Sequence, residues 1–363
     1  MPAHALEIAA AAIAALAALA VLHYAFWTWR LAVPTREDEV LAARTGDGWI
    51  VYLGRRKPRG AARRPPVLLV HGIAMNRQAF DFGVERYSLA AFLAAAGFDC
   101  FTLDLRGHGR SRRGPARRWN LDTYLAEDLP AALDAIRGAT GEERVLYVGH
   151  SQGAILGMAL CGLLPERVAA LVQLDGPAYF FDALPRLRRL VRLRRLGLGR
   201  HLRELARMVA PFSGVWHPAE VELAINTRNV ERPIYRRLLV NALEDLQPGV
   251  LDQFATSIAE DSFRSADGKV DYRALFPSCR QPALFVSAEK DRLAPPPVME
   301  AAFRAWGGPK RYWSCGPDYG HTDVLLGRSA PEAVFPAIRD FLLEHAELPA
   351  GVPASSIPIS PGR

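Results

Sequence analysis

The sequence predicts an α/β protein built on a mostly parallel sheet with helices on both faces. Short apolar runs alternate with amphipathic helical segments between residues 67 and 174, which is the pattern of consecutive β-α-β units. The run at residues 67–70 is apolar at every position, as expected for a strand covered on both faces. The alternation stops after residue 175 and resumes with an apolar run at residues 282–287. We therefore expect a helical cap inserted between two parts of one sheet.

The composition is consistent with one large domain. Of 363 residues, 50% are hydrophobic, which is enough to bury a large core. The four cysteines have neither the spacing of a metal site nor that of a disulfide framework. They are Cys100, Cys161, Cys279 and Cys315. No ligand spacing or phosphate loop indicates a metal or an organic cofactor, so none is predicted.

Residues 5–29 form an alanine- and leucine-rich run about one bilayer long, with Tyr24, Trp27 and Trp29 near its end. We interpret this run as an N-terminal, single-pass transmembrane helix. A cleaved signal peptide is one alternative, because residues 18–20 have the small-residue form of a cleavage site. A buried helix is the other. The anchor is favoured because no Lys or Arg precedes the run and apolar residues continue past residue 20.

Basic residues are concentrated after this run. Arg30, Arg36 and Arg44 are followed by six further basic residues between positions 55 and 64. Under the positive-inside rule, this asymmetry predicts that the body of the protein faces the cytoplasm.

The elements expected after the anchor follow in chain order. A first strand at residues 47–52 precedes a hydrated basic loop that begins at Arg55, and His108 lies in an arginine-rich turn that we also expect to be hydrated. Further strands are predicted at residues 67–70, 98–103, 145–148, 169–174, 283–287 and 311–314. Helices are predicted at residues 87–96, 121–137, 154–164 and 332–343.

The strand at residues 145–148 runs into the pentapeptide Gly149-His150-Ser151-Gln152-Gly153 and then into an apolar helix. A G-x-S-x-G sequence between a strand and a helix has the form of a nucleophile elbow. The serine occupies a strained turn, and small residues at its flanks allow the strand and the helix to approach each other. A chance pentapeptide is the alternative in a chain with 29 glycines. The strand and helix on either side favour Ser151 as a nucleophile.

The strand at residues 67–70 ends in His71-Gly72-Ile73. Acyl transfer needs two backbone N–H groups aimed at the developing oxyanion, one from the residue after the nucleophile and one from the loop after this strand. The sequence therefore predicts Gln152 and Ile73 as the oxyanion-hole donors, with His71 and Gly72 as the supporting turn. An ordinary strand-ending turn is the alternative.

Candidates for a base and an acid follow two later strands. Asp291 comes after the strand at residues 283–287, and His321 comes after the last predicted strand. A carboxylate in this position can orient an imidazole that serves as general base. Asp323 and Glu289 are alternative acids on sequence alone. The order nucleophile, acid, histidine favours Asp291 with His321.

The expected cap, residues 176–280, contains a basic segment at residues 184–208. Nine arginines and one glutamate give this segment a net charge of +8, and leucines and valines lie between the charges. This pattern indicates an amphipathic helix that contacts anionic membrane headgroups, with a simply solvated charged face as the alternative. No recognised nucleic-acid-binding motif accompanies the arginines, so nucleic acid is not an expected partner.

Together these motifs resemble the α/β-hydrolase superfamily, and within it the acid-lipase and gastric-lipase group with its bacterial relatives. The motifs are HGI at residues 71–73, YLAEDLPA at 124–131, YVGHSQG at 147–153 and GHTD at 320–323. The resemblance spans residues 65–175 and 281–345. It implies the α/β-hydrolase fold and hydrolysis of carboxylic esters of lipids or of other apolar acyl chains.

The predicted chemistry is that of a serine hydrolase working through an acyl-enzyme intermediate. His321 takes the proton of Ser151, Asp291 holds the imidazole, and water releases the acid. An acyltransferase would use the same three residues, and a non-catalytic, membrane-bound ligand-binding protein on the same fold is a further alternative. Dehalogenases and epoxide hydrolases are disfavoured because they place a carboxylate where Ser151 stands.

The expected organisation is as follows. Residues 1–30 form a membrane anchor, 31–64 a basic linker with the first strand, 65–175 and 281–345 the hydrolase core, 176–280 a cap, and 346–363 a disordered tail. The expected partners are a small-molecule or lipid ester and a membrane, which is contacted by residues 5–29 and by the basic segment 184–208.

Overall fold

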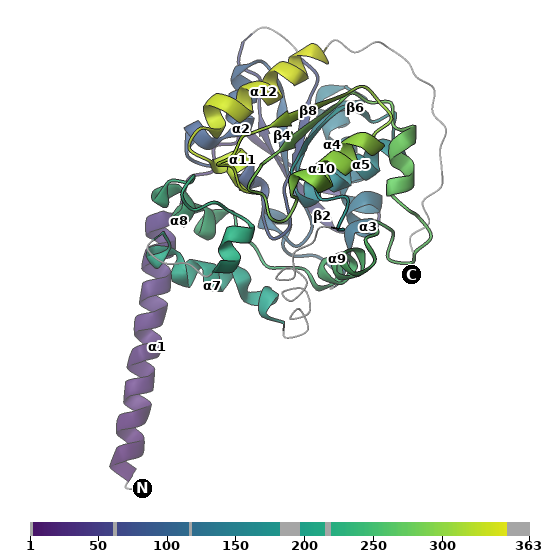
Figure 1. Ribbon diagram of the computed structural model, residues 1–363. Helices are drawn as coiled ribbons and strands as arrows, with labels where there is room; N and C mark the ends of the chain where they lie inside the picture. The colour runs from purple at the N-terminus through teal and green to yellow at the C-terminus, as the bar shows by residue number, and fades with distance from the viewer. Residues whose placement is uncertain (1–2, 61–63, 116–117, 182–196, 215–218, 347–363) are drawn as a thin grey trace.

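The computed structural model describes residues 3–60, 64–115, 118–181, 197–214 and 219–346 (Figure 1). Two predictions therefore fall largely outside the described residues. These are the disordered tail, beyond residue 346, and the part of the basic segment between residues 184 and 196.

The described residues form one eight-stranded sheet in the order β1-β2-β4-β3-β5-β6-β7-β8. β1 and β2 pair antiparallel with each other, and β2 is also antiparallel to β4. The other six strands, β3 to β8, are all parallel, so the predicted mostly parallel sheet is confirmed. The strands are β1 (Glu39–Arg44), β2 (Ile50–Arg56), β3 (Val67–Val70), β4 (Cys100–Asp104), β5 (Val145–His150), β6 (Val168–Leu174), β7 (Ala283–Ser287) and β8 (Lys310–Ser314).

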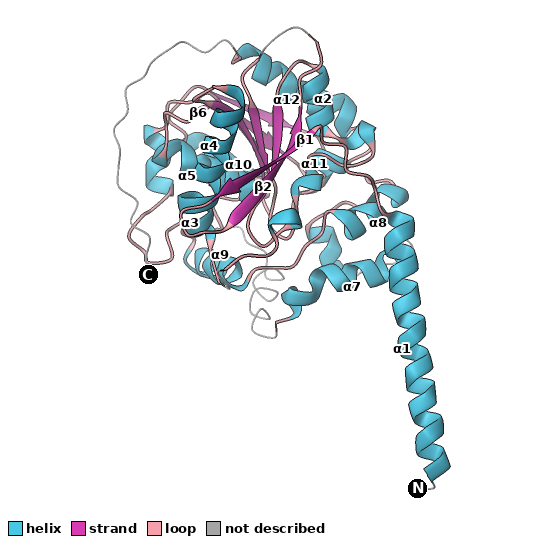
Figure 2. Ribbon diagram, turned by 180° about the vertical axis from the view of Figure 1, so that it is seen from behind, coloured by secondary structure: helices cyan, strands magenta, loops and turns pink. Residues whose placement is uncertain are grey.

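Helices cover both faces of the sheet, as predicted (Figures 1 and 2). One face carries α2 (Leu89–Ala95), α11 (Asp323–Leu326) and α12 (Ala330–Glu344), and the other carries α4 (Leu129–Thr140), α5 (Gln152–Leu163) and α10 (Pro296–Ala305). Alternate strand residues point to opposite faces, so Leu69 and Val148 join the core beneath α2 and α12, whereas Leu68 and Tyr147 join the core beneath α4 and α5.

The N-terminal edge of the sheet differs from the prediction. The strand β1 was not predicted, and Arg55 and Arg56 lie within β2 instead of in a hydrated loop. Arg56 is only 4% exposed and pairs with Asp81 at 2.8 Å, and Arg55 pairs with Asp99 at 2.6 Å. These aspartates lie far along the chain, and their charges make a buried strand position acceptable for an arginine.

The turn after β4 is also buried instead of hydrated. The rings of His108 and His71 lie 5.1 Å apart, and Arg106 is fully buried. The Arg106 Nε donates to Asp128 Oδ1 at 2.6 Å. Asp128 ends a π-helical turn, η4 (Tyr124–Asp128), between α3 (Leu121–Thr123) and α4. The predicted helix at residues 121–137 is therefore interrupted where its acidic residue meets this arginine.

The chain between β6 and β7 leaves the alternating pattern, as the sequence indicated. Its described part contains α7 (Leu202–Val209), α8 (Arg232–Asn241) and α9 (Pro248–Glu260), with the short helices η8 (Ala219–Leu223) and η9 (Arg273–Ser278). This segment, called the cap segment below, contacts the carboxyl edge of the sheet at several points. Leu243 bridges to Met75, and the Thr322 N–H donates to the Ala224 carbonyl oxygen at 2.9 Å.

The helix α1 (Ala3–Leu31) projects from the body (Figure 1). Residues Leu6–Leu31 are long and apolar enough to cross a membrane, and none of the most apolar window is buried. This exposure contradicts the buried-helix alternative. The length and composition fit both an anchor and a signal sequence, and the end of α1 packs against α7 and α8.

Candidate active site

The carboxyl ends of four parallel strands bring the candidate residues together. The turn containing Gly72 follows β3, Ser151 follows β5, Asp291 follows β7 and His321 follows β8. Because these strands are parallel, their carboxyl ends lie along the same edge of the sheet, where open α/β sheets bind ligands.

Ser151 occupies a strained turn between β5 and α5. Its φ of 53° and ψ of −118° are unusual for a residue with a side chain. A Cβ on Gly153 would lie 2.0 Å from the Val70 carbonyl oxygen, and a Cβ on Gly149 would lie 2.4 Å from the Gly153 carbonyl oxygen. Both glycines are therefore needed for the close approach of strand and helix that holds the serine at the turn.

The three predicted polar residues form one hydrogen-bonded chain. The Nε2 atom of His321 lies 2.8 Å from the Ser151 Oγ, and its Nδ1 lies 2.6 Å from the Asp291 Oδ2. The second oxygen of Asp291 accepts the backbone N–H groups of Leu293 and Ala294 at 2.7 and 2.9 Å. With Nδ1–H donated to the carboxylate, Nε2 is left to accept the serine proton.

The alternative acids lie elsewhere. Asp323 accepts hydrogen bonds from the Asn226 backbone and from the Asn229 amide, and burial raises the pKa of its carboxyl to about 6. Glu289 accepts the hydroxyl of Ser314 at 2.7 Å. Of the three candidate carboxylates, the structure therefore places Asp291 against His321.

The turn at residues 71–73 packs against the elbow. A Cβ on Gly72 would lie 3.1 Å from both the His150 Nδ1 and the Ser151 Cβ. The His71 ring fixes this turn, because its Nδ1 lies 2.8 Å from the Gly72 carbonyl oxygen and its Nε2 accepts the Leu105 N–H at 3.2 Å. Burial, with a smaller contribution from the His108 ring, lowers the pKa of His71 to about 3, so the imidazole is neutral.

The backbone N–H groups predicted to bind the oxyanion are not used in hydrogen bonds within the described fold. Neither the Ile73 nor the Gln152 backbone N–H has a hydrogen-bond partner among the described residues. By contrast, the Ser151 N–H is used within the fold, donating to the Leu174 carbonyl oxygen at 2.8 Å. The N–H of Gln152 is also the first of α5, where the helix dipole favours negative charge.

A further carboxylate, missed in the sequence, lies beside this chain. Asp175 follows β6 with a φ of 48°, is fully buried, and accepts the Ala288 N–H at 2.9 Å through Oδ1. Its Oδ2 has no partner among the described residues. Burial and the charge of Asp291 raise the pKa of Asp175 well above its usual range. The only sequence signal was its position directly after a parallel strand.

Asp175, Asp291 and His321 offer ligand atoms within 4.8 Å of one another, a spacing that would also suit a metal ion. Two of these ligand atoms already bond to each other, however, because the His321 Nδ1 lies at hydrogen-bond distance from the Asp291 Oδ2. A cation there would have to displace the shared proton and break this contact. The hydrogen-bonded chain accounts for Asp291 and His321, whereas Asp175 accepts the Ala288 N–H instead.

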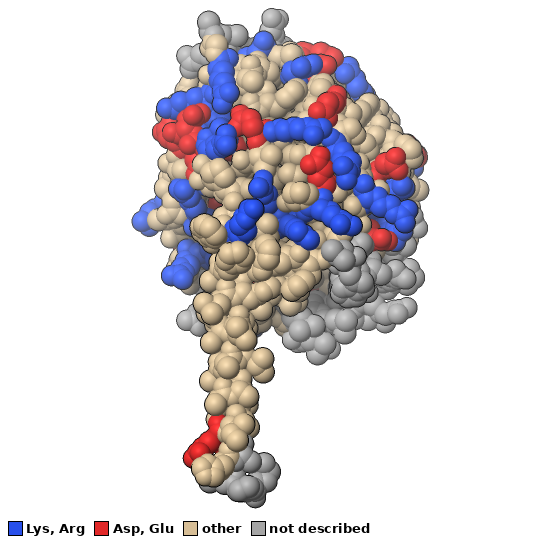
Figure 3. Space-filling view, turned by 90° about the vertical axis from the view of Figure 1, so that its left-hand side faces the viewer, with Lys and Arg blue, Asp and Glu red and all other residues tan. Residues whose placement is uncertain are grey.

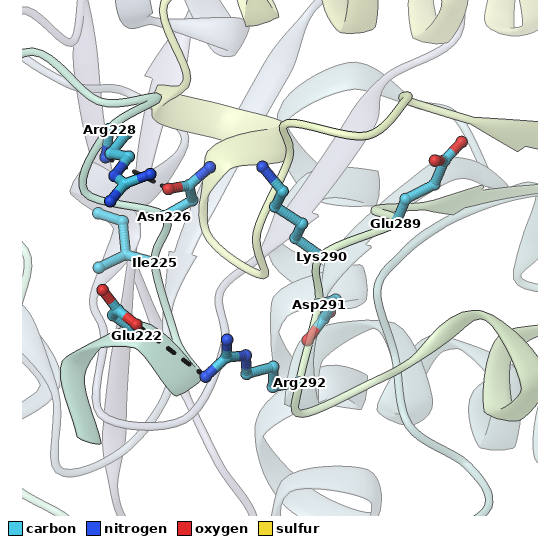
Figure 4. A pocket seen from close by; sticks show the side chains of 8 residues that line it. All are labelled: Glu222, Ile225, Asn226, Arg228, Glu289, Lys290, Asp291 and Arg292. Carbon is cyan, nitrogen blue, oxygen red and sulfur yellow. Dashed lines mark hydrogen bonds and ion pairs between the residues drawn. The ribbon is translucent and has the colours of Figure 1, made fainter. Parts of the chain in front are cut away.

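The site is almost completely buried. Ser151 is 6% exposed and His321 is 4% exposed. A cavity of about 440 Å³ reaches Asp291 from outside and is lined mostly by polar and charged side chains (Figure 4). Glu222 and Arg292 form an ion pair across its rim at 4.0 Å (Figure 4). Ser151 does not line this cavity.

The fold is the α/β-hydrolase fold, and comparisons with known proteins agree. Residues 65–196 match the family model described as "alpha/beta hydrolase fold". A thermophilic esterase from Thermogutta terrifontis superposes with a TM-score of 0.58 at 24% identity, covering 85% of this chain and 99% of that one. The enol-lactonase from Burkholderia xenovorans LB400 superposes with a TM-score of 0.56 at 19% identity, covering 84% of this chain and 100% of that one. At these identities the likeness shows the fold alone.

Curated relatives narrow the resemblance to lipases, as the motifs predicted. The chain is 33% identical over 142 residues to human "Lysosomal acid lipase/cholesteryl ester hydrolase", covering 36% of this chain and 36% of that protein. It is 35% identical over 153 residues to "Triacylglycerol lipase 2" of Arabidopsis thaliana, covering 37% of this chain and 36% of that protein. The match thus spans about a third of the length of these relatives. The predicted resemblance to the α/β-hydrolase superfamily and its acid-lipase group is confirmed.

Proposed function

We propose that this protein is a membrane-anchored serine hydrolase that cleaves carboxylic esters with apolar acyl chains. The observation that carries the proposal is the continuous hydrogen-bonded chain from the Asp291 carboxylate through His321 to the Ser151 hydroxyl. The similarity to lipases supports an ester as substrate.

In the proposed reaction, the Ser151 Oγ attacks the ester carbonyl carbon while the His321 Nε2 takes its proton. The N–H groups of Ile73 and Gln152 stabilise the tetrahedral oxyanion. As the intermediate collapses, the C–O bond to the alcohol breaks, and His321 returns the proton to the departing oxygen. A water molecule then attacks the acyl-enzyme carbonyl carbon while His321 takes its proton, and the same steps release the carboxylic acid and restore the Ser151 hydroxyl.

The test compares Ser151→Ala with Ser278→Ala, a matched control on an exposed serine of η9. We expect Ser151→Ala to abolish turnover of a p-nitrophenyl acyl ester and labelling by a fluorophosphonate, and Ser278→Ala to preserve both. Full turnover in Ser151→Ala would refute the assignment. Labelling without turnover of any ester would favour a non-hydrolytic role, and product analysis with an added alcohol would separate hydrolysis from acyl transfer.

The anchor is the second part of the proposal. An exposed apolar helix with arginines concentrated after it supports a single membrane span with the body in the cytoplasm. We expect the purified chain to retain residues 3–31 and to resist extraction from membranes by alkaline carbonate. A protease added outside intact cells should leave the body whole. Loss of the helix from the mature chain would instead identify a signal sequence.

A further inference from the structure

A row of exposed apolar side chains lies on the cap segment beside α1. Outside α1, the described residues contain four exposed large hydrophobic side chains, of which three are Leu205, Val209 and Phe212. Their exposed fractions are 59%, 44% and 64%. The spacing i, i+4, i+7 places them on one face of α7 and the short turn that follows it. We call these three residues the apolar edge.

Contacts from α1 hold the apolar edge in place. The ring of Phe212 stacks on that of His23 with centroids 5.6 Å apart, and the His23 Nε2 lies 3.0 Å from the Met208 carbonyl oxygen. The Arg207 Nη1 donates to the Tyr24 hydroxyl at 3.3 Å. The apolar edge is therefore fixed at the level of residues 23 and 24 of α1.

That level coincides with the expected membrane surface. The part of α1 before His23 comprises residues 3–22, or twenty residues. At about 1.5 Å per residue they span about 30 Å, the thickness of a bilayer hydrocarbon core. Tyr24 and Trp27 then lie where aromatic residues mark the membrane–water interface. With residues 3–22 in the hydrocarbon and the aromatic end of the predicted anchor, from His23 onward, at the interface, the apolar edge is held at the boundary between acyl chains and headgroups.

Arginines surround this junction. Five of them have no ion-pair partner among the described residues: Arg30 at the end of α1, Arg207 on α7, and Arg232, Arg236 and Arg237 on α8. Because α8 packs against both α1 and α7, these charges lie around the carboxyl-terminal end of α1. Figure 3 shows Lys and Arg side chains in a band above the projecting helix, with residues other than Lys, Arg, Asp and Glu between the band and the helix. Such a distribution complements anionic lipid headgroups.

We propose that the apolar edge and these five arginines form a second membrane contact, which seats the cap segment on the anionic bilayer that α1 enters. This inference rests on the anchor in the proposed function, but not on the catalytic roles of Ser151, His321 and Asp291. Leu205, Val209 and Phe212 enter the headgroup–acyl boundary, and the arginines bind lipid phosphates. The cap segment then faces the lipid, so an ester held in the bilayer reaches it without crossing bulk water.

The direct test uses the full chain reconstituted in liposomes of phosphatidylcholine and phosphatidylglycerol. An environment-sensitive NBD fluorophore is attached to Leu205→Cys in a Cys315→Ser background, since the other three cysteines are buried. The control position is Glu142→Cys, an exposed site beside the amino end of β5. We expect doxyl-labelled lipid to quench the fluorophore at position 205 and to leave that at position 142 unchanged. Equal quenching at the two sites would overturn the proposal.

The arginine contribution is tested in the same system. The variant R232Q/R236Q/R237Q removes three charges from α8, and the control R137Q/R304Q/R311Q removes three exposed charges from α4, α10 and β8. Near an anionic membrane each arginine contributes roughly 1 kcal/mol, so the α8 variant should lower the ratio of docked to undocked cap on the order of a hundredfold. Quenching at position 205 should then be lost, whereas the control keeps it. Quenching that survives the α8 variant would show that the arginines do not bind the bilayer.

An activity comparison separates docking from catalysis. We expect L205S/V209S/F212S to lower turnover of a long-chain ester presented in liposomes and to leave turnover of a soluble short-chain ester unchanged. If wild type cleaves neither ester while position 205 is still quenched, the proposed hydrolase activity fails and the docking surface stands. If wild type and variant cleave the liposomal ester equally, the docking proposal fails and the hydrolase stands.

Discussion

The Nε2 atom of His150 lies 2.9 Å from the backbone carbonyl oxygen of His321, and the two imidazole rings are 4.8 Å apart. A carbonyl oxygen only accepts, so the His150 Nε2 carries a proton and donates it. The residue before the candidate nucleophile thus holds the backbone of the candidate base. This contact links the elbow after β5 to the loop after β8, which are far apart in the chain.

Replacing His150 should therefore lower kcat by displacing His321. We expect His150→Leu to reduce kcat on a soluble ester on the order of a hundredfold, since a displacement of about 1 Å at a reacting group has effects of that size. KM should change little, because His150 acts on the base and not on the substrate. His150→Gln is the matched variant, because its amide N–H can replace the Nε2 donor. A Gln variant as slow as the Leu variant would argue against the hydrogen bond as the cause.

The same histidine gives a pH dependence of stability. Burial, with a smaller contribution from His321, lowers the pKa of His150 from 6.5 to about 3. Below pH 6.5 the unfolded chain takes up a proton that the folded chain does not, so stability present above pH 6.5 is lost progressively as the pH falls toward 3. At pH 5 this loss approaches about 2 kcal/mol, with about 1.4 kcal/mol per pH unit.

Urea unfolding of the chain in detergent, followed by tryptophan fluorescence, measures this loss. Wild type should lose more free energy of unfolding between pH 7 and pH 5 than His150→Gln, because the variant lacks the titrating group. The difference between the two profiles isolates His150 from buried carboxylates such as Asp323, whose raised pKa acts in the opposite direction. Parallel profiles would contradict a buried, neutral His150.

Two glycine substitutions should have opposite effects on stability. In Gly153→Ala the new Cβ would lie 2.0 Å from the Val70 carbonyl oxygen, a backbone atom that cannot move without displacing β3. We expect a loss of about 1–3 kcal/mol or more. Gly138 lies in the exposed part of α4 with nothing within 4 Å of a Cβ, so Gly138→Ala should gain about 0.4–1 kcal/mol. Thermal unfolding of the three proteins measures both; destabilisation by Gly138→Ala would contradict this account of the helix.

The sequence predicted the strands and the positions of the candidate site residues correctly where they depend on local pattern or on their order in the chain. Apolar runs predicted the parallel strands, and the elbow pentapeptide placed Ser151 between a strand and a helix with the expected strained φ. Chain order favoured Asp291 and His321, which the fold brings within hydrogen-bond distance. Chain order also favoured Asp291 over Asp323, which comes after His321 in the chain, and the structure shows that Asp323 bonds instead to Asn226 and Asn229.

The predictions from sequence were wrong or incomplete where distant parts of the chain determine the environment of a residue. Arg55 and Arg56 look like loop residues in the sequence, but Asp99 and Asp81 provide buried partners for them. The strand β1 is a short edge strand with mixed burial, so its sequence lacks a clear alternation. Asp175 looked like an ordinary residue at a strand end, and only the folded sheet shows it beside Asp291.

Asp175 and Asp291 are both buried beside His321, and they differ in the number of hydrogen-bond donors around their carboxyl oxygens. Asp291 accepts two backbone N–H groups and faces the imidazole Nδ1. Asp175 accepts one N–H, and its Oδ2 has no partner among the described residues. Burial and the neighbouring charge of Asp291 raise the pKa of Asp175 well above its usual range, which favours the neutral acid at this position. Of the two residues, only Asp291 lies at hydrogen-bond distance from the imidazole.

Asparagine substitutions distinguish the roles of the two carboxyl groups, because an amide has the shape of a neutral carboxylic acid. We expect Asp175→Asn to keep kcat within a few-fold of wild type, since the amide oxygen can still accept the Ala288 N–H and the amide has the shape of the neutral acid that burial favours. Asp291→Asn should lower kcat on the order of a thousandfold or more, because an amide donor facing Nδ1 favours the wrong imidazole tautomer. Kinetics on a soluble ester, with the folded state verified by circular dichroism, measure both effects. An equal loss in the two variants would mean that Asp175 shares the negative charge and that the acid is a coupled pair.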